Sequence, residues 1–114
     1  MIVRGCEFPE DRHYHPEMNV WVKEEGAGIV RLGATAYGVA LAVEFFAFVP
    51  KAVGTRVESG KAVGLLELAK TMVSVRTPVP GEILGRNELA VATPSLIAED
   101  PYREGWLVRL KTGT

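Results

Sequence analysis

Several features that would place a protein in a functional class are missing from this sequence of 114 residues. A single cysteine, Cys6, cannot form an internal disulfide, which fits a reducing cytoplasm. No apolar run approaches the ~20 residues that span a bilayer, because Glu44 interrupts the longest one, residues 39–49. The formal net charge is −1, and the basic residues are scattered among acids rather than gathered into a stripe. We therefore expect a small cytoplasmic domain that binds neither membrane nor nucleic acid.

Motifs of catalysis and of metal binding are also missing. No glycine-rich phosphate loop opens a helix, and no serine lies in a Gly-x-Ser-x-Gly context. His13 and His15 have a spacing that suits two metal ligands on one strand, but no second close pair follows them. The N-terminal stretch MIVRGCEFPED becomes acidic at once and has no apolar region, which argues against a signal peptide. Because no nucleophile–base pair can be named, we do not expect an enzyme.

What the sequence does contain is a series of short segments bounded by proline and glycine, typical of strands joined by turns. Alternation predicts a hairpin of residues 19–23 and 28–32, and Thr35 is a suitable N-cap for a short helix over residues 36–42. Further strands are predicted over residues 43–49, 62–69, 72–77, 82–88 and 106–111, with a helical turn after residue 95. The aromatic residues at strand positions are expected in the core: Trp21, Phe45, Phe46, Phe48 and Trp106.

Lys70 interrupts this pattern between two apolar strands. It is flanked by the small residues Ala69 and Thr71, which suits a tight hairpin that displays one side chain. An exposed lysine is a strongly hydrated amine, so it is a poor unassisted nucleophile but an accessible acceptor for enzymatic acylation. From the local pattern alone, an ordinary surface lysine remains the alternative.

Two blocks of sequence resemble the glycine cleavage system H-protein family. The first is ELAKTMVSVRTPVPGE, residues 67–82, with a glutamate three residues before the lysine and a Pro-x-x-Gly-Glu turn after the next strand. The second is EDPYREGWL, residues 99–107, which is similar to the family's Asp-Pro-Tyr-x-x-Gly-Trp motif. The order and spacing of the blocks also match, and the resemblance covers residues 19–111.

This resemblance implies a mainly β fold, the barrel-sandwich hybrid of lipoyl and biotinyl carriers, with short helical segments. The chain would be one domain, residues 1–114, with an N-terminal extension over 1–18 and a core over 19–111. Lys70 would carry lipoic acid in amide linkage, and Glu67 would support recognition by a lipoate ligase or lipoyl transferase. The lipoyl arm would shuttle an aminomethyl group from glycine decarboxylase to aminomethyltransferase, and dihydrolipoyl dehydrogenase would be the third partner, which reoxidises the arm. The chemistry belongs to the cofactor, so the chain itself would be a non-catalytic carrier.

Some positions depart from the family pattern. Asn19-Val20 stands where H-proteins usually have His-Glu, Ser74 where they have an aspartate, and Val43 where an acid is usual. In the family, the acids replaced by Val20 and Ser74 lie near the cleft that shelters the aminomethyl-loaded arm. A carboxylate paired with a cationic amine is worth ~1–3 kcal/mol. The departures leave the carrier function intact and put glycine cleavage in question.

Alternatives to glycine cleavage stay open at this point. The stretches VRGCEFP (3–9) and FVPKAVG (48–54) are similar to a branch of lipoate-binding proteins that serves sulfur oxidation with a heterodisulfide-reductase-like complex. A biotin carrier is disfavoured, because the usual Met-Lys-Met is replaced by Ala69-Lys70-Thr71. A third alternative is an interaction module that keeps the fold without any modification.

Overall fold

The computed structural model of the chain describes residues 2–3, 6–7, 9–42, 44–69 and 71–112. Within these residues the N-terminal strands are β1 (Ile2–Val3), β2 (Cys6–Glu7), β3 (His13–His15), β4 (Val20–Gly26) and β5 (Ile29–Ala34). The later strands are β6 (Ala47–Pro50), β7 (Arg56–Val57), β8 (Ala62–Glu67), β9 (Met72–Arg76), β10 (Gly81–Arg86) and β11 (Val108–Lys111). The helices are α1 (Ala36–Ala42), α2 (Glu88–Ala92) and α3 (Ser95–Glu99).

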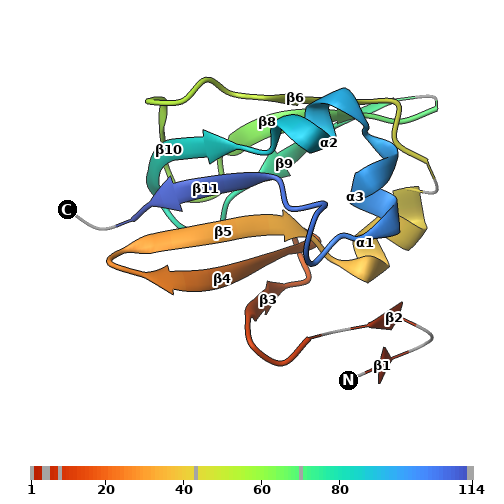
Figure 1. Cartoon of the computed structure of the whole chain (residues 1–114), viewed down its shortest axis with the longest axis horizontal. Coiled ribbons are helices and arrows are strands. Elements are labelled where there is room, and N and C mark those ends of the chain that lie inside the picture. The colour runs from red at the N-terminus through yellow and green to blue at the C-terminus, as the bar shows by residue number, and fades with distance from the viewer. Residues whose placement is uncertain (1, 4–5, 8, 43, 70, 113–114) are drawn as a thin grey trace.

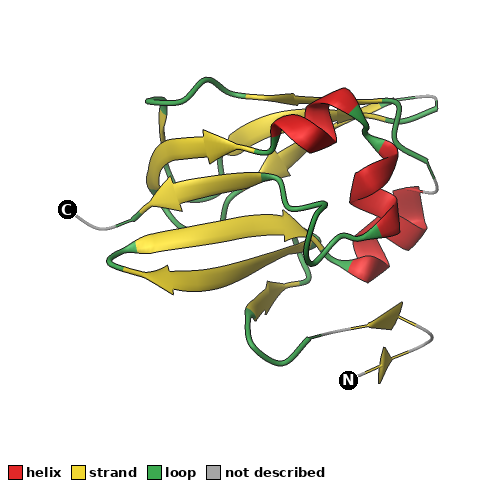
Figure 2. Ribbon diagram, in the orientation of Figure 1, coloured by secondary structure: helices red, strands yellow, loops and turns green. Residues whose placement is uncertain are grey.

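Two antiparallel sheets form the body of the protein (Figure 1). The larger sheet has six strands in the order β3-β4-β5-β11-β10-β7, and the smaller has three in the order β6-β8-β9. A separate pair, β1-β2, lies at the N-terminus. The helices gather at one end of the sheets (Figure 2). The predicted mainly β architecture with short helices is confirmed, and β3, within residues 1–18, joins the large sheet through β4.

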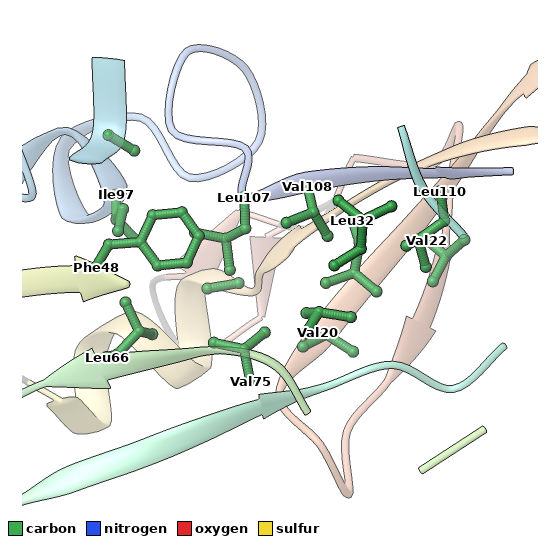
Figure 3. Packing of buried hydrophobic residues seen from close by; sticks show 14 of the residues in the cluster. Val20, Val22, Leu32, Phe48, Leu66, Val75, Ile97, Leu107, Val108 and Leu110 are labelled. Atoms are coloured by element: carbon green, nitrogen blue, oxygen red, sulfur yellow. The ribbon is translucent and has the colours of Figure 1, made fainter. Parts of the chain in front are cut away.

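The core lies between the two sheets (Figure 3). Val20 and Leu32 of the large sheet belong to one cluster with Phe48 and Leu66 of the small sheet, and Leu107 and Val75 lie between these two groups. Full burial of such a side chain contributes about 1.5–3 kcal/mol. Val20 and Val22 of β4, and Val30, Leu32 and Ala34 of β5, belong to this core, which is the two-residue spacing expected of strands with one face inward.

The second family-like block, residues 99–107, packs against β4. The ring of Tyr102 in this block lies 6.2 Å from the ring of Trp21 in β4. The Trp21 indole is completely buried, and its Nε1 donates to the carbonyl of Pro101 at 3.1 Å. The Tyr102 hydroxyl accepts a hydrogen bond from the backbone N–H of Ala36, at the start of α1, at 2.8 Å. Gly33 leaves room for the indole, since a Cβ there would lie 2.4 Å from the ring. These residues therefore join β4, α1 and the loop after α3.

Asn87 explains why the predicted strand over residues 82–88 is wrong at its end. β10 stops at Arg86, and the Asn87 side-chain oxygen caps α2 by accepting from the N–H of Leu89 at 3.2 Å. The Asn87 side-chain nitrogen donates to the carbonyls of Glu104 and Trp106, at 2.6 and 2.8 Å. One asparagine thus begins a helix and fixes the C-terminal loop.

The predicted strand over residues 43–49 is also corrected. The strand covers Ala47–Pro50, and the chain before it is irregular, so the two-residue alternation does not extend back to Phe46. Phe45 and Phe48 are buried as expected, but Phe46 is 52% exposed. Trp106 is half-buried, with the Arg31 guanidinium 5.1 Å from its ring centre. The predictions of Ala36–Ala42 as a helix and of Thr35 as its cap are confirmed, because Thr35 Oγ1 accepts from the N–H of Gly38 at 3.0 Å.

Candidate functional site

The predicted hairpin around residue 70 is formed by β8 and β9. The strands pair through Glu67 with Met72, and the N–H of Leu68 donates to the carbonyl of Thr71 at 2.8 Å. Only two residues of the chain, 69 and 70, separate this hydrogen-bonded pair. Lys70 itself lies outside the described residues. Its neighbours Ala69 and Thr71 are both exposed, so the protein leaves this turn accessible to a large partner.

Glu67, the other predicted site residue, is the last residue of β8. Its side chain is exposed, and its carbonyl accepts a hydrogen bond from the N–H of Phe46 at 2.8 Å. The backbone of Glu67 is therefore fixed on both sides, by Phe46 and by β9. This leaves a carboxylate three residues before Lys70 free to face a partner.

A pocket of about 310 Å³ lies beside the hairpin, against β9, which is an edge strand of the small sheet. This volume falls at the small end of the range for ligand pockets. The sequence did not reveal it, because its walls come from segments far apart in the chain. They include Met18, Asn19 and Val20 around the start of β4, Gly38 of α1, and Val73, Ser74 and Val75 of β9.

The lining of this pocket is electrically neutral. Among the described residues that line it there is no aspartate, glutamate, lysine, arginine or histidine. Val20 and Ser74, the two positions where the sequence departs from the family's acids, both contribute to the wall. The pocket therefore suits an apolar group with one or two polar atoms rather than a cation.

The histidines do not form a metal centre with the residues around them. His13 and His15 lie on β3 at positions that share one face of the strand. No group of three or more His, Cys, Asp or Glu residues in the described part of the chain is arranged to hold a metal ion. No helix within the described ranges is both long and apolar enough to cross a membrane.

Asp11, at the N-terminal edge of the large sheet, has a lowered pKa. The Arg12 guanidinium, through a hydrogen bond of 2.9 Å, and then Lys23 hold the pKa of Asp11 at about 2, below its ordinary 3.8. The Arg12 side chain is almost fully buried, 4.5 Å from the Trp21 ring centre, and donates to the Tyr102 carbonyl at 2.7 Å. This cluster supports the fold and has no group poised for chemistry.

Comparison with known sequences finds similarity over nearly the whole chain. The sequence profile of the glycine cleavage H-protein matches residues 12–114. Glycine cleavage system H protein 5 of Aquifex aeolicus is 39% identical over 113 residues, which are 96% of this chain and 76% of that protein. Probable glycine cleavage system H protein 3 of Sulfurisphaera tokodaii is 40% identical over 111 residues, covering 97% of this chain and 80% of that one.

Comparison with solved structures finds the same fold. The crystal structure of a glycine cleavage system H protein from Mycobacterium marinum superimposes with a TM-score of 0.85 at 30% sequence identity. The match covers 94% of this chain and 87% of that one. This confirms the predicted barrel-sandwich hybrid.

Proposed function

This chain belongs to the glycine cleavage H-protein family, whose members are non-catalytic lipoyl carriers, and we propose that Lys70 is its lipoyl attachment site. The observation that carries this proposal is the two-residue turn between β8 and β9, with exposed residues on both sides of position 70. The exposed residues Ala69 and Thr71 leave this segment accessible to a modifying enzyme, and the Leu68–Thr71 hydrogen bond holds its two ends together. The amide forms when the lysine amine, losing a proton, displaces the activating group from the lipoyl carboxyl.

Tethering is what the protein contributes to the chemistry. The lipoyl group on a lysine stem is held near each partner enzyme at a high effective concentration, while its dithiolane carries the reaction. The partners in this proposal are enzymes of a lipoate-dependent system in the cytoplasm, together with the ligase or transferase that attaches the group. Glu67 is proposed to assist the ligase, because its carboxylate is exposed next to the turn.

The attachment site is tested by lipoylation with a purified lipoate ligase, lipoate and ATP, followed by intact mass. Wild type should gain one lipoyl group and Lys70→Arg none. Lys61→Arg, a matched change at an exposed lysine just before β8, should be modified like wild type. Glu67→Gln should slow the modification by about tenfold, as loss of a charge at an interface rim reduces association. Modification of Lys70→Arg at the wild-type rate would disprove the assignment.

Glycine cleavage is the first candidate pathway, as the family name suggests. In it the arm carries an aminomethyl group, which is cationic. Lipoylated chain incubated with glycine, tetrahydrofolate, NAD⁺, glycine decarboxylase, aminomethyltransferase and dihydrolipoyl dehydrogenase would then support glycine-dependent NADH formation. Failure of a fully lipoylated chain to do so would remove this pathway and leave the carrier function standing.

The neutral pocket favours a second candidate, a carrier for sulfur oxidation with a heterodisulfide-reductase-like complex. A sulfur-loaded arm needs no carboxylate in its shelter, and Val20 and Ser74 provide none. Aquifex aeolicus has three relatives of this chain, named glycine cleavage system H protein 2, 3 and 5. Several members of the family in one organism are consistent with specialised functions.

The two candidates are separated by restoring an acid to the pocket wall. Ser74→Asp should increase the protection of an aminomethyl-loaded arm against hydrolysis by about tenfold, as a charge-assisted pair would. Ser59→Asp, which adds the same charge at a distant turn, is the matched control and should leave this rate unchanged. If wild type already protects the loaded arm as well as Ser74→Asp does, the neutral pocket is no obstacle to glycine cleavage.

A further inference from the structure

The outer face of the six-stranded sheet carries a row of cations in register. Lys23 of β4 lies directly opposite Arg31 of β5, which lies directly opposite Arg109 of β11. Residues paired in this way project from the same face of a sheet. Val22 before Lys23, and the residues on both sides of Arg31 and of Arg109, are buried in the core, so the three cations point outward. The three strands are adjacent in Figure 1.

A second row extends this charge across the sheet. Lys111 of β11 pairs with Glu82 of β10, which pairs with Arg56 of β7. We call the outward residues Lys23, Arg31, Arg56, Arg109 and Lys111 the cationic face. With Glu25 and Glu82 on the same side of these strands, five cations and two carboxylates give a net charge of +3. The whole chain has −1, so the remaining residues together carry −4.

The ion pairs on this side neutralise the row only in part. The Glu25 carboxylate is shared, 2.9 Å from Arg31 and 2.9 Å from Arg109. Asp11 is shared in the same way between Arg12, at 2.9 Å, and Lys23, at 3.2 Å. Each cation of the row therefore has a carboxylate within 3.2 Å, but Glu25 and Asp11 are shared among these three cations and Arg12, so the row keeps a net positive charge. The Nε of Arg31 is buried and has no hydrogen-bond partner within the described residues, so a partner protein can contact this guanidinium only through its other nitrogens.

From this face we propose that the protein docks an acidic helix of a partner protein. The side chains of Lys23, Arg31 and Arg109 are 41%, 34% and 39% exposed, so their charged ends are accessible while their stems pack. Paired residues on adjacent strands have Cα atoms about 5 Å apart. Side chains three or four residues apart on a helix are spaced by about 5–6 Å, so a stripe of carboxylates matches the row.

The surroundings of the row favour a protein over a nucleic acid. The hollow of about 510 Å³ beside Lys23 and Arg31 also has Glu10 and Glu104 on its wall. These carboxylates and Asp11 interrupt the positive surface, so it lacks the continuous cationic stripe that follows a phosphate backbone, whereas a helix with one narrow stripe of carboxylates can face the row alone. Trp106, half-buried next to Arg31, adds an apolar contact of the kind found in protein interfaces.

Docking here leaves the hairpin free. The cationic face belongs to the large sheet, and the β8–β9 hairpin to the small one. A partner held on the large sheet would therefore keep the arm close without covering the turn that carries it. The proposal itself does not depend on modification of Lys70, and Lys70→Arg should bind the same partner.

The test is an NMR titration of the full-length, isotope-labelled protein with a helical peptide of about 20 residues that has glutamates along one stripe. A second peptide has the same composition with its glutamates spread around the helix. The striped peptide should bind at least about fivefold more tightly, shift signals of β4, β5 and β11, and weaken as salt is raised. Equal binding of the two peptides, or shifts centred on the hairpin, would overturn the proposal.

Removing two positive charges from the cationic face, or two from the small sheet, distinguishes docking at this face from nonspecific attraction of the acidic peptide to the protein. The double variant Arg109→Gln and Lys111→Gln should lose about tenfold in affinity, as expected for two exposed charge pairs. The double variant Lys51→Gln and Arg76→Gln removes the same charge near the small sheet and should change affinity by less than about twofold. Equal losses, or tighter binding of a single-stranded oligonucleotide or of phosphatidylserine–phosphatidylcholine vesicles at the same salt, would refute an acidic helix as the occupant.

Discussion

The large sheet and the β8–β9 hairpin place different demands on their residues. In the large sheet Trp21 is completely buried, its N–H is used by Pro101, and Gly33 is the residue that leaves space for its ring. In the hairpin, Met72 is 52% exposed and the turn is closed by one hydrogen bond between Leu68 and Thr71. In the large sheet, therefore, a side chain must fit the packing around it. In the hairpin, a side chain must leave the turn accessible to other proteins. Substitutions should change stability in the large sheet and function at the hairpin.

The largest effect on stability is expected from Trp21→Ala. Removal of a fully buried ring should lower the free energy of unfolding by about 3–5 kcal/mol, because the site cannot collapse around the lost volume. Trp106→Ala is the matched control, and since that ring is half-buried it should lose less than half as much. Urea unfolding followed by circular dichroism measures both. Equal losses of unfolding free energy in the two variants would contradict the claim that stability depends on how deeply each tryptophan is buried.

Asn87→Ala should have the next largest effect, about 2–3 kcal/mol. The change removes the cap of α2, worth about 1 kcal/mol, and leaves the carbonyls of Glu104 and Trp106 without their donor. Asn87→Asp separates the two parts, because the carboxylate still accepts from Leu89 but no longer donates. Thermal unfolding of both variants checks this. If Asn87→Asp is as stable as wild type, the two donor bonds contribute nothing.

Asp11 should give a smaller, pH-dependent effect at the edge of the large sheet. The pKa of Asp11 in the folded protein is about 2, below its ordinary 3.8, so folding favours the carboxylate. Its contribution is complete above pH 3.8 and is lost as the pH falls through about 2. The effect is small because the side chain is exposed. The difference in Tm between wild type and Asp11→Asn should therefore shrink from pH 5 to pH 2, and a constant difference would contradict the pairing with Arg12.

The smallest effect is expected at the hairpin, where Met72→Thr should change stability by less than about 0.5 kcal/mol. The residue is exposed, and threonine suits a strand. Val75→Thr, three residues later in the same strand but buried, should cost about 1–3 kcal/mol because it buries a hydroxyl. Unfolding curves of the two variants thus compare an exposed position with a buried position of the same strand. Equal stabilities would mean that β9 does not contribute to the core.

Much of the fold was predictable because its signals are local. The alternation of β4 and β5, the cap at Thr35 and the small residues around position 70 each act over a few residues. The end of β10 was not predictable in this way, because the role of Asn87 depends on α2 and on the carbonyls of Glu104 and Trp106, which are distant in the sequence. Phe46 was misplaced because an aromatic residue at a strand boundary has the same local pattern as one inside the strand.

The site was predictable only in part, because its two components differ in how they are built. The hairpin and Glu67 come from one continuous block, so sequence alone suggested them. The pocket joins Val20, Gly38 and Ser74 from separate elements, and the row of Lys23, Arg31 and Arg109 needs the register of three strands. The departures at Val20 and Ser74 were visible in the sequence, but that both line one neutral pocket became evident only in the structure.

The central claim, that Lys70 carries a lipoyl group, is tested most directly on protein isolated from its native host. Intact mass, followed by peptide mapping across residues 62–76, should find one lipoyl group per chain on the peptide that contains Lys70. Lys70→Arg expressed in the same host should lack it. Wholly unmodified wild-type protein, from a host that lipoylates its other carriers, would contradict the account, and a biotin adduct would do so as well.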